Sequence, residues 1–401
     1  MNAAAAIALL KTIKHLGTGL LRRATQTVTR FEEIGLGRLP SRLQRCQADR
    51  CPVCSNSAQN PIQKRLVYLV SASNLPSGGN KVIYRHVELA QRDGLAVEVM
   101  HPERPAGFRY RWFEHAVIPL ADDQLCPSRD HLVLPEVWAA LGTKFCKPAG
   151  FAYSIFVQNG YLLHLNAGFT QAMLREAYTA AEHVVAISDD SAAMVSRAYP
   201  SIAESRIFRV VASISRQFKP APAKAREITF LRRKLRSHSE RVEAYLQPLL
   251  PAGWSLIGIE NASEAGVAAL FARSAIFLSF SELEGLGLPP LEAALAGNRV
   301  VGYHGQGGKE YFDPPIFYPV ACGDIHGILD QTLAAIADFE HNPQGTPDML
   351  AQREALKLTY GAERERQTVL NFQHAALATP AGADPLAAPG RSSIRNIRQT
   401  N

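Results

Sequence analysis

The chain has 401 residues, of which 47% are hydrophobic, so it is long enough for two domains with cores of their own plus extensions. Its net charge of +7 comes from residues 1–64, where ten lysines and arginines stand against three acids, and the rest of the chain carries equal numbers of each sign. This uneven distribution argues against a nucleic-acid-binding body, and we expect no nucleic-acid partner.

The basic extension, residues 1–64, begins with a predicted amphipathic helix over residues 3–30. Apolar side chains fall near one side of this helix and basic side chains fall elsewhere. Two interpretations stay open: peripheral contact with an anionic membrane surface, or a poorly ordered tail or helix packed on the body. Lys11 interrupts the apolar run, which excludes a transmembrane helix, and no basic residue precedes the run as in a secretory signal. We expect a cytoplasmic protein, with or without contact with the inner face of the membrane.

Three cysteines lie close together in this extension, at Cys46, Cys51 and Cys54. Their C-x2-C pair suggests zinc, but a zinc site needs four ligands and no second pair exists. We therefore favour reduced thiols and expect no metal, since a metal site here would need ligands from a partner chain. The other three cysteines are interpreted as small, buried apolar residues: Cys126, Cys146 and Cys322.

The first folded domain is predicted over residues 65–215. Its opening elements are a strand, a glycine-rich turn, a helix and a second strand, over residues 65–73, 74–80, 81–92 and 96–100. This βαβ order, with Gly78 and Gly79 in the turn, indicates a Rossmann-like nucleotide- or phosphate-binding fold. The turn lacks the G-x-G-x-x-G pattern of dinucleotide enzymes, so no nicotinamide or flavin cofactor is expected. A plain tight turn is the alternative interpretation of the two glycines.

Two later strands of this domain, predicted over residues 152–158 and 184–187, lead into polar residues. The carboxyl ends of strands in an open parallel sheet face the ligand crevice, so Gln158 and Asn159 are candidate substrate contacts. Ser188 is interpreted as the N-cap of the helix that follows, with substrate contact as a second interpretation.

The second domain, residues 216–345, starts with a predicted hinge over residues 216–220. Its strands are predicted over residues 227–231, 255–258, 275–280, 299–303 and from 312 onward, and its helices over residues 264–273 and 325–339. Arg232, Arg233 and Lys234 follow the first strand directly, and cations at the end of a strand can neutralise a diphosphate. A solvated basic turn is the alternative.

Three further segments complete the second half of the chain. The glycines of residues 304–311 indicate a close approach of the backbone to a ligand. A helix is predicted over residues 349–371, within a C-terminal segment of residues 346–374. Residues 375–401 are rich in Ala, Pro, Gly and Ser and are expected to be disordered.

The most informative segment is FLSFSELEGLGLPPLE, which ends at Glu292. An apolar strand leads into a glycine loop, and Pro289 and Pro290 suit the first turn of a helix that Gly297 ends. The free amides at such a helix start favour a phosphate. Glu284 and Glu292 flank this start, and their carboxylates suit the hydroxyl groups of a sugar and a ribose on either side of a diphosphate. The alternative is a surface acid and an acid that stabilises the helix dipole.

The stretch EGLGLPPLEAALAG resembles the signature E-G-x-G-L-P-x-x-E-A-x-A-x-G of the retaining glycosyltransferases of group 1 (family 4). Every fixed position is met, and Leu286 stands where the family usually has Phe. The resemblance implies the α/β fold called GT-B, in which two Rossmann-like domains face a central cleft, here with an N-terminal helical extension and a disordered C-terminal tail. It also implies that the helix over residues 349–371 crosses back to the first domain.

The resemblance assigns roles around the donor. Glu284, with the amides of the following loop, would hold the donor sugar and distal phosphate, and Glu292 would bind the ribose. Arg233 and Lys234 would offset charge on the leaving diphosphate. The remaining donor-binding residues implied by the resemblance are Gly285, Leu286, Gly287, Leu288, Gly78 and Gly79, with residues 259–265 lining the base pocket.

Many members of the resembled family carry a histidine near the end of the strand predicted over residues 152–158, where it hydrogen-bonds the donor sugar. The matching position here is Gln158 or Asn159. Two histidines elsewhere in the chain, His101 and His164, are candidate substitutes.

The function expected from this resemblance is transfer of a hexose-type sugar from a nucleotide diphosphate sugar to a glycan or lipid-linked glycan acceptor in surface polysaccharide synthesis. No cofactor beyond this co-substrate is expected, and the absence of a D-x-D motif favours a metal-independent reaction. The chain also lacks the motifs of serine hydrolases, zincins and P-loop NTPases. The main alternative is a catalytically silent GT-B adaptor that binds a nucleotide sugar, a membrane or a protein partner. A GT-B epimerase or hydrolase is disfavoured by the signature.

Overall fold

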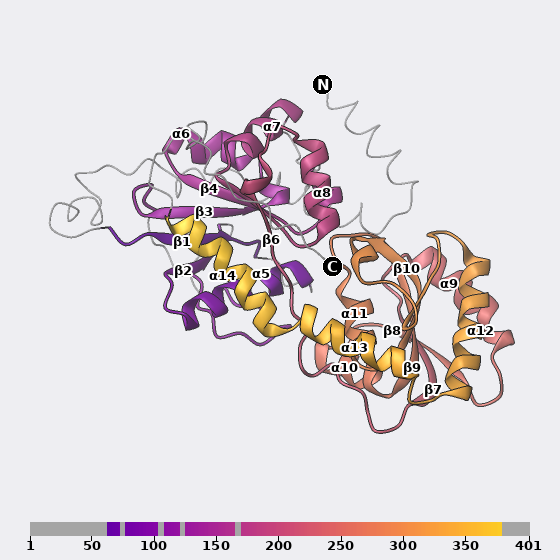
Figure 1. Ribbon diagram of the computed structural model, residues 1–401. Helices are drawn as coiled ribbons and strands as arrows, with labels where there is room; N and C mark the ends of the chain where they lie inside the picture. Colours follow the sequence, from indigo (N-terminus) through magenta and orange to yellow (C-terminus); the bar gives the residue numbers. More distant parts are fainter. Residues whose placement is uncertain (1–61, 73–76, 103–107, 121–124, 165–169, 379–401) are drawn as a thin grey trace, which may run out of the picture.

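The computed structural model describes residues 62–72, 77–102, 108–120, 125–164 and 170–378. The predicted helix over residues 3–30, the Cys46–Cys51–Cys54 cluster and most of the C-terminal tail lie outside these residues. The described residues form two lobes, each built on a parallel sheet, and the C-terminal helices run from the second lobe to the first (Figure 1).

The first sheet has six parallel strands in the order β2-β1-β3-β4-β5-β6. Their bounds are β1 Arg65–Leu69, β2 Val97–Met100, β3 Asp130–Pro135, β4 Ala152–Val157, β5 His183–Ala186 and β6 Ile207–Arg209. Successive side chains point to opposite faces of a strand, so Leu66 and Tyr68 of β1 enter one core cluster and Val67 and Leu69 enter another. Both faces of this sheet are therefore buried, as parallel sheets require.

Helices cover both faces of the first sheet. One face packs against α5 (Gly78–Arg92), and the other packs against α7 (Gln171–Ala180) and α8 (Asp189–Ala198). Shorter helical segments complete this lobe: η2 Glu136–Trp138, the π-helix η3 Gly142–Cys146, α6 Lys147–Ala149, η4 Gly160–Leu162 and η5 Glu204–Arg206.

The second sheet has five parallel strands in the order β11-β10-β9-β7-β8. Their bounds are β7 Ala225–Leu231, β8 Ser255–Ile259, β9 Ser274–Glu284, β10 Arg299–Gln306 and β11 Phe317–Pro319. The helices of this lobe are α9 Arg236–Leu246, η6 Gln247–Leu249, α10 Glu264–Arg273, α11 Leu288–Leu295, η7 Gly307–Glu310 and α12 Ile325–His341. Two core clusters again cover the two faces of the sheet.

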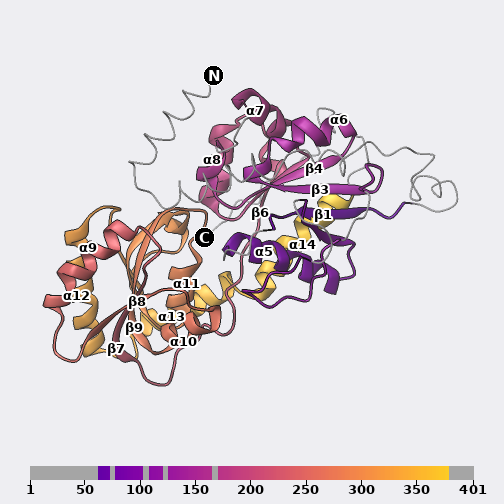
Figure 2. The same ribbon diagram turned by 180° about the vertical axis from the view of Figure 1, so that it is seen from behind.

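The chain ends in two helices, α13 (Pro347–Thr359) and α14 (Ala362–Ala378), that connect the lobes (Figures 1 and 2). Helix α13 packs against α11 of the second lobe, and α14 packs against α5 of the first. The α14 residue Glu365 accepts a hydrogen bond of 2.7 Å from the Nε atom of Arg85, and Gln373 donates one of 3.2 Å to the carbonyl of His86. The C-terminal helix is therefore part of the first lobe's surface.

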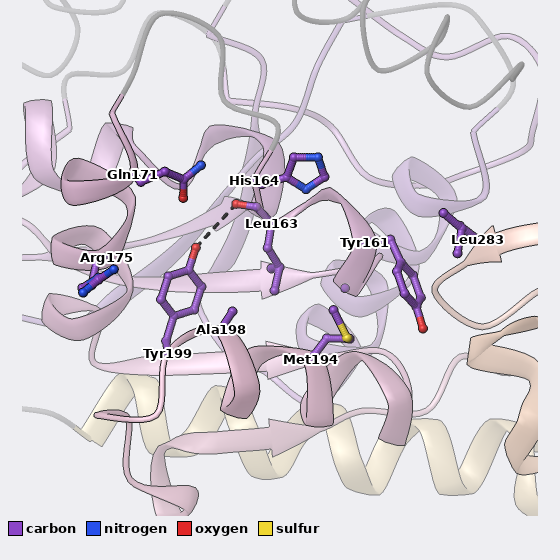
Figure 3. A pocket seen from close by; sticks show the side chains of 10 residues that line it. Tyr161, Leu163, His164, Gln171, Arg175, Met194, Ala198, Tyr199 and Leu283 are labelled. Carbon is purple, nitrogen blue, oxygen red and sulfur yellow. Dashed lines mark hydrogen bonds between the residues drawn. The ribbon is translucent and has the colours of Figure 1, made fainter. Parts of the chain in front are cut away.

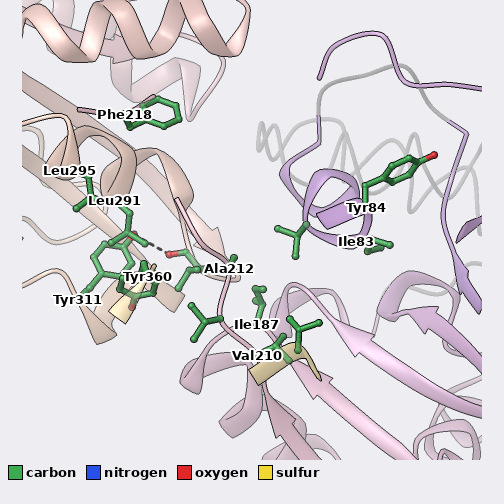
Figure 4. Close-up of a cluster of buried hydrophobic side chains, with 14 of the residues drawn as sticks. Ile83, Tyr84, Ile187, Val210, Ala212, Phe218, Leu291, Leu295, Tyr311 and Tyr360 are labelled. Carbon is green, nitrogen blue, oxygen red and sulfur yellow. Dashed lines mark hydrogen bonds between the residues drawn. The ribbon is translucent and has the colours of Figure 1, made fainter. Parts of the chain in front are cut away.

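One hydrophobic cluster extends through both lobes (Figure 4). It contains Ile83 and Ile187 from the first lobe, Leu291 and Tyr311 from the second, and Tyr360 from the junction of the two C-terminal helices. Burial of apolar side chains is the main stabilising contribution to such a core, and here it also fixes α11, the helix that carries the second acid of the motif.

The structure corrects several expectations from the sequence. Helix α5 begins at Gly78, so both glycines open a helix and do not form a turn before it. Strand β9 continues to Glu284 because it pairs with β10 as far as Gln306, so this acid ends a strand and does not lie in a loop. The single helix predicted over residues 349–371 is two helices. Cys322 is exposed, whereas Cys126 and Cys146 are buried as expected.

Within the part of the chain that the structure describes, no helix combines the length and apolarity needed to span a bilayer.

Candidate functional site

The carboxyl ends of β4 and β9 meet where the two lobes face each other. The Nδ2 atom of Asn159, just after β4, donates a hydrogen bond of 3.0 Å to the carbonyl of Leu283 in β9. A Cβ atom on Gly285 would overlap the main-chain oxygen of Gln158. Only glycine therefore permits this close approach of the two backbones.

The structure brings together three predicted residues of the first lobe and one of the second. The side chain of Gln158 donates a hydrogen bond of 2.8 Å to the carbonyl of Gly79, at the start of α5. A Cβ atom on Gly78 would lie 3.4 Å from the side chain of Leu288, at the start of α11. The amino-terminal ends of two helices, one from each lobe, therefore lie at the same place, and such ends favour anions.

On the second-lobe side, Glu284 forms an ion pair with Lys234, which follows β7. The loop after this acid is held by Tyr311, whose hydroxyl donates to the carbonyls of Leu286 (3.0 Å) and Gly287 (2.6 Å). Gly287 caps α11 with a φ of 79°, a left-handed conformation that favours glycine. The loop is therefore fixed in shape before any ligand binds.

The second acid, Glu292, lies in α11 and is partly buried. Burial raises the pKa of Glu292 to about 7, and the charge of Glu264 acts in the same direction. Lys81 and Arg233 oppose this rise by favouring the carboxylate. The acid is therefore poised between its two protonation states near neutral pH.

Arg233 and Lys234 lie next to the two acids of the motif, one near Glu292 and the other paired with Glu284. The neighbouring Arg232 instead forms an ion pair with Glu243, so it has a structural partner. Two cations of the basic turn therefore lie at the site, and the third is bound to Glu243 of α9.

Backbone strain is concentrated at the same edge of the second sheet. The non-glycine residues with positive φ in the described part of the chain are Leu235 after β7, Asn261 after β8 and Gln306 at the end of β10, with φ of 34°, 50° and 66°. Residues held in this sparsely populated region cluster at ligand sites in proteins. The strained positions thus mark the edge that carries Lys234 and Glu284.

Three other predicted candidates receive different roles. Ser188 is fully buried, and its Oγ accepts the N–H of Ser191 at 3.0 Å, so it is an N-cap with no surface left for a substrate. His101 is buried and lies between the Tyr84 hydroxyl and the Val70 carbonyl, at 2.7 and 2.9 Å, so it is structural. His164 is exposed and lines a groove beside the site.

Two residues of the site were missed from the sequence. Lys81, in the first turn of α5, forms an ion pair with Glu264 of the other lobe. Glu136 is 4% exposed, and its carboxylate accepts the main-chain N–H of Gln158 at 3.3 Å. Burial raises the pKa of Glu136 to about 7. A single acid in the apolar run HLVLPEVW was the available signal for Glu136, whereas nothing in the sequence indicated the partner of Lys81.

The described residues contain no group of three or more His, Cys, Asp or Glu side chains placed to hold a metal ion.

Solved structures share this two-lobed architecture. A sucrose-phosphate synthase from Thermosynechococcus elongatus aligns with 79% of this chain and 99% of its own, with a TM-score of 0.58 and 13% identity. HepE of Anabaena, solved in complex with UDP-glucose, aligns with 78% of this chain and 99% of its own, with a TM-score of 0.58 and 12% identity. The fold is GT-B. The expected pair of Rossmann-like domains is thereby confirmed.

Sequence comparison finds similarity over a smaller part of the chain. No protein-family model matches the chain. An alpha-1,6-glucosyltransferase of Actinobacillus pleuropneumoniae serotype 7 (strain AP76) is 32% identical over 130 residues, which are 30% of this chain and 39% of that protein. The chain thus spans about two fifths of this curated relative.

Proposed function

We propose that this protein is a retaining glycosyltransferase that moves a hexose from a nucleotide diphosphate sugar to a glycan or lipid-linked glycan acceptor. One observation carries the proposal: Glu284, Glu292, Arg233 and Lys234 gather at the end of the second sheet, opposite the start of α5, in a GT-B fold. Paired acids for sugar hydroxyls and paired cations for a diphosphate are the complementary chemistry of one ligand class.

Each residue has a role in binding the donor. Glu284 and the loop amides after it hold the hexose and the distal phosphate, while Glu292 accepts hydrogen bonds from the ribose. Pro289 and Pro290 lack an N–H, so the first turn of α11 offers few amide donors of its own. Arg233 and Lys234 therefore carry most of the charge compensation on the diphosphate.

The proposed reaction needs no protein nucleophile. The acceptor oxygen forms a bond to the anomeric carbon on the face from which the diphosphate departs, and the bond to the diphosphate breaks. The acceptor proton moves to the departing phosphate oxygen. Arg233 and Lys234 stabilise the charge that develops on this leaving group, without a metal ion. Contact between the lobes at Gly285 excludes water from the donor and limits hydrolysis.

The relatives indicate which donor to test first. UDP-glucose is the first donor to test, because HepE was solved with it and the curated relative is a glucosyltransferase. A role in surface polysaccharide synthesis agrees with such a donor. The basic extension, residues 1–64, would bring the enzyme to the inner face of the membrane if the segment predicted as a helix over residues 3–30 binds anionic lipid.

Titration calorimetry with UDP-, GDP-, ADP- and dTDP-glucose tests the donor site. We expect the protein to bind one of these nucleotides and Glu292→Ala to bind it about ten- to a hundredfold more weakly, since the variant loses charged hydrogen bonds. Glu354→Ala, which removes an exposed acid of α13, is the matched control and should bind like the wild type. Folded protein that binds none of the four donors would refute the proposal.

A further inference from the structure

A groove of about 390 Å³ lies on the first lobe beside the proposed donor site (Figure 3). Its walls come from η4, α7 and α8, and Leu283 of β9 closes one end. This volume falls within the range of roughly 300–1,000 Å³ that small-molecule sites occupy. The proposed donor-binding roles leave the groove without a ligand.

Hydrogen bonds of Asn159 connect the inner end of the groove to the donor site. Its Oδ1 atom accepts the N–H of Tyr161 at 2.9 Å, and its Nδ2 atom donates to the carbonyl of Leu283 at 3.0 Å. Tyr161 and Leu283 both line the groove, and Leu283 directly precedes Glu284. A molecule in the groove would therefore end next to the sugar that Glu284 is proposed to hold.

The walls are preorganised. Tyr199 stacks on Tyr178 with ring centres 4.1 Å apart, and its hydroxyl lies 3.5 Å from the carbonyl of Leu163 (Figure 3). Burial raises the pKa of Tyr161 to about 12, and a hydrogen bond with Asp190 acts in the same direction. Fixed aromatic and aliphatic side chains with a few polar groups are the usual lining of a site for a ring-shaped ligand.

The outer end of the groove is positively charged. Gln171 and Arg175 lie four residues apart on α7, so they share one face of this helix. None of the described residues that line the groove is acidic. Arg175 forms no salt bridge with any acid in the described part of the chain, and the neighbouring Glu176 is paired with Lys147 at 2.9 Å. An anionic group at this end would find an unshared guanidinium.

We infer that the groove is the acceptor subsite and that it takes a saccharide with a carboxylate or phosphate on the ring away from the accepting hydroxyl. This inference rests on the proposed function, because it places the hydroxyl beside the donor sugar. The apolar faces of the sugar rings pack on Tyr161 and Met194, and Arg175 binds the anion. Arg175 thereby selects acidic acceptors over neutral ones of the same length.

The test uses three matched disaccharides as probes: cellobiose, cellobiouronic acid and cellobiose 1-phosphate. Each is titrated by saturation-transfer NMR into the full-length protein saturated with UDP. We expect at least one of the two anionic probes to bind about fivefold more tightly than cellobiose, as for one partly exposed charged hydrogen bond. The anionic probe that binds more tightly shows whether the preferred anion is a carboxylate or a phosphate.

Four variants assign this preference to the groove. Arg175→Gln should abolish it, and Arg175→Lys should keep part of it. Arg92→Ala removes an exposed charge from the end of α5 that does not line the groove, and it should leave the preference unchanged. Ala198→Trp fills the groove at an exposed position and should remove binding of all three disaccharides while UDP binding persists.

The inference is wrong if the three disaccharides bind equally, if none of them binds to the UDP-saturated protein, or if Arg92→Ala and Arg175→Gln lose the preference alike. UDP binding is measured first on every sample. Wild-type protein that binds neither UDP nor any of the other three nucleotides contradicts the proposed function, and with it this inference, before any saccharide is added.

Discussion

The two acids of the motif differ in their surroundings. Glu284 is neutralised by Lys234, whereas Glu292 has cations near it but a pKa raised to about 7 by burial. A carboxylate can accept hydrogen bonds from two ribose hydroxyls, and its protonated form accepts fewer. The protonation state of Glu292 should therefore control donor binding near neutral pH.

Donor affinity should depend on pH through Glu292. The pKa of this acid is raised to about 7, so the carboxylate is half populated near pH 7, predominates above it and is lost as the pH falls below it. The dissociation constant of UDP-glucose, whose phosphates do not titrate in this range, should rise by up to about tenfold per pH unit below 7. Calorimetry from pH 5.5 to 8.5 measures this, and a flat profile in the wild type would contradict it.

Two neighbours of Glu292 should shift this pH dependence in opposite directions. Lys81 lowers the pKa of Glu292 and Glu264 raises it, so Lys81→Ala should move the midpoint to higher pH and Glu264→Gln to lower pH. Glu292→Gln should remove the dependence. Shifts of the midpoint in the same direction in both neighbour variants would show that another group titrates.

Glu136 should make the protein less stable as the pH rises. Its folded-state pKa is about 7, above the ordinary value of 4.5, so the folded state holds a proton that the unfolded state loses between pH 4.5 and 7. Ionisation of Glu136 should cost on the order of 1–3 kcal/mol of unfolding free energy across this window. We therefore expect the free energy of unfolding, measured with denaturant, to rise for Glu136→Gln relative to the wild type between pH 5 and pH 8. The same difference at both pH values would refute this prediction.

At the residue scale, the sequence was informative where local spacing determines the chemistry. Glu284, Glu292 and the loop between them could be predicted as a group because one continuous segment carries them. Lys81 and Glu136 were missed because each acquires its role from a residue far away in the chain, Glu264 and Gln158 respectively. Ser188 was correctly interpreted as an N-cap, because capping needs only the next three residues.

At the scale of elements, the contact between the lobes depends on a glycine loop. Gly285 lies against Gln158 and Asn159 of the other lobe, whereas Gly302 of β10 lies against Ser279 within its own sheet. The two glycines are both required by a close backbone approach, but one approach is between domains and the other is inside a domain. The same substitution should therefore have different consequences at the two positions.

Gly285→Ala should hold the lobes apart without unfolding either of them. We expect its turnover number to fall by at least about tenfold with little change in melting temperature, because the added Cβ obstructs only the closed arrangement. Gly302→Ala is the matched control, and it should lower the melting temperature because its Cβ meets Ser279 within the sheet at a φ of 126°. A large loss of stability in Gly285→Ala would place the clash inside a domain and contradict this account.

The limits of elements could be predicted only in part. Helix α10 was predicted over residues 264–273 and is observed there, because Ser263 caps it and the apolar spacing is regular. Helix α5 starts before the predicted position because glycine, a poor residue inside helices, is tolerated at Gly78 and Gly79 in the first turn. Strand β9 is longer than predicted because pairing with β10, which no local pattern shows, extends it to Glu284.

At the scale of the whole molecule, the C-terminal helices connect the two lobes into one protein. Helix α14 closes the core of the first lobe, and Glu310 of the second lobe accepts hydrogen bonds from the main chain of Asp189 (2.9 Å), from Arg209 (2.5 Å) and from Tyr360 (2.8 Å). Glu310 ends η7, whose Gly307 lies against the main chain of Glu284 and Gly285, so these contacts join the lobes beside the first acid of the motif. Opening of the lobes to admit a donor would break them.

The measurement that tests the central claim most directly is release of nucleoside diphosphate from the nucleotide sugar that calorimetry identifies, with and without a saccharide acceptor. We expect the wild type to release it, the acceptor to accelerate the release, and Glu284→Ala to slow the reaction by about a hundredfold or more, as for loss of an interaction with the reacting sugar. A wild-type protein that binds the nucleotide sugar but releases no more diphosphate than Glu284→Ala would contradict the account. It would identify the chain as a silent GT-B binding protein.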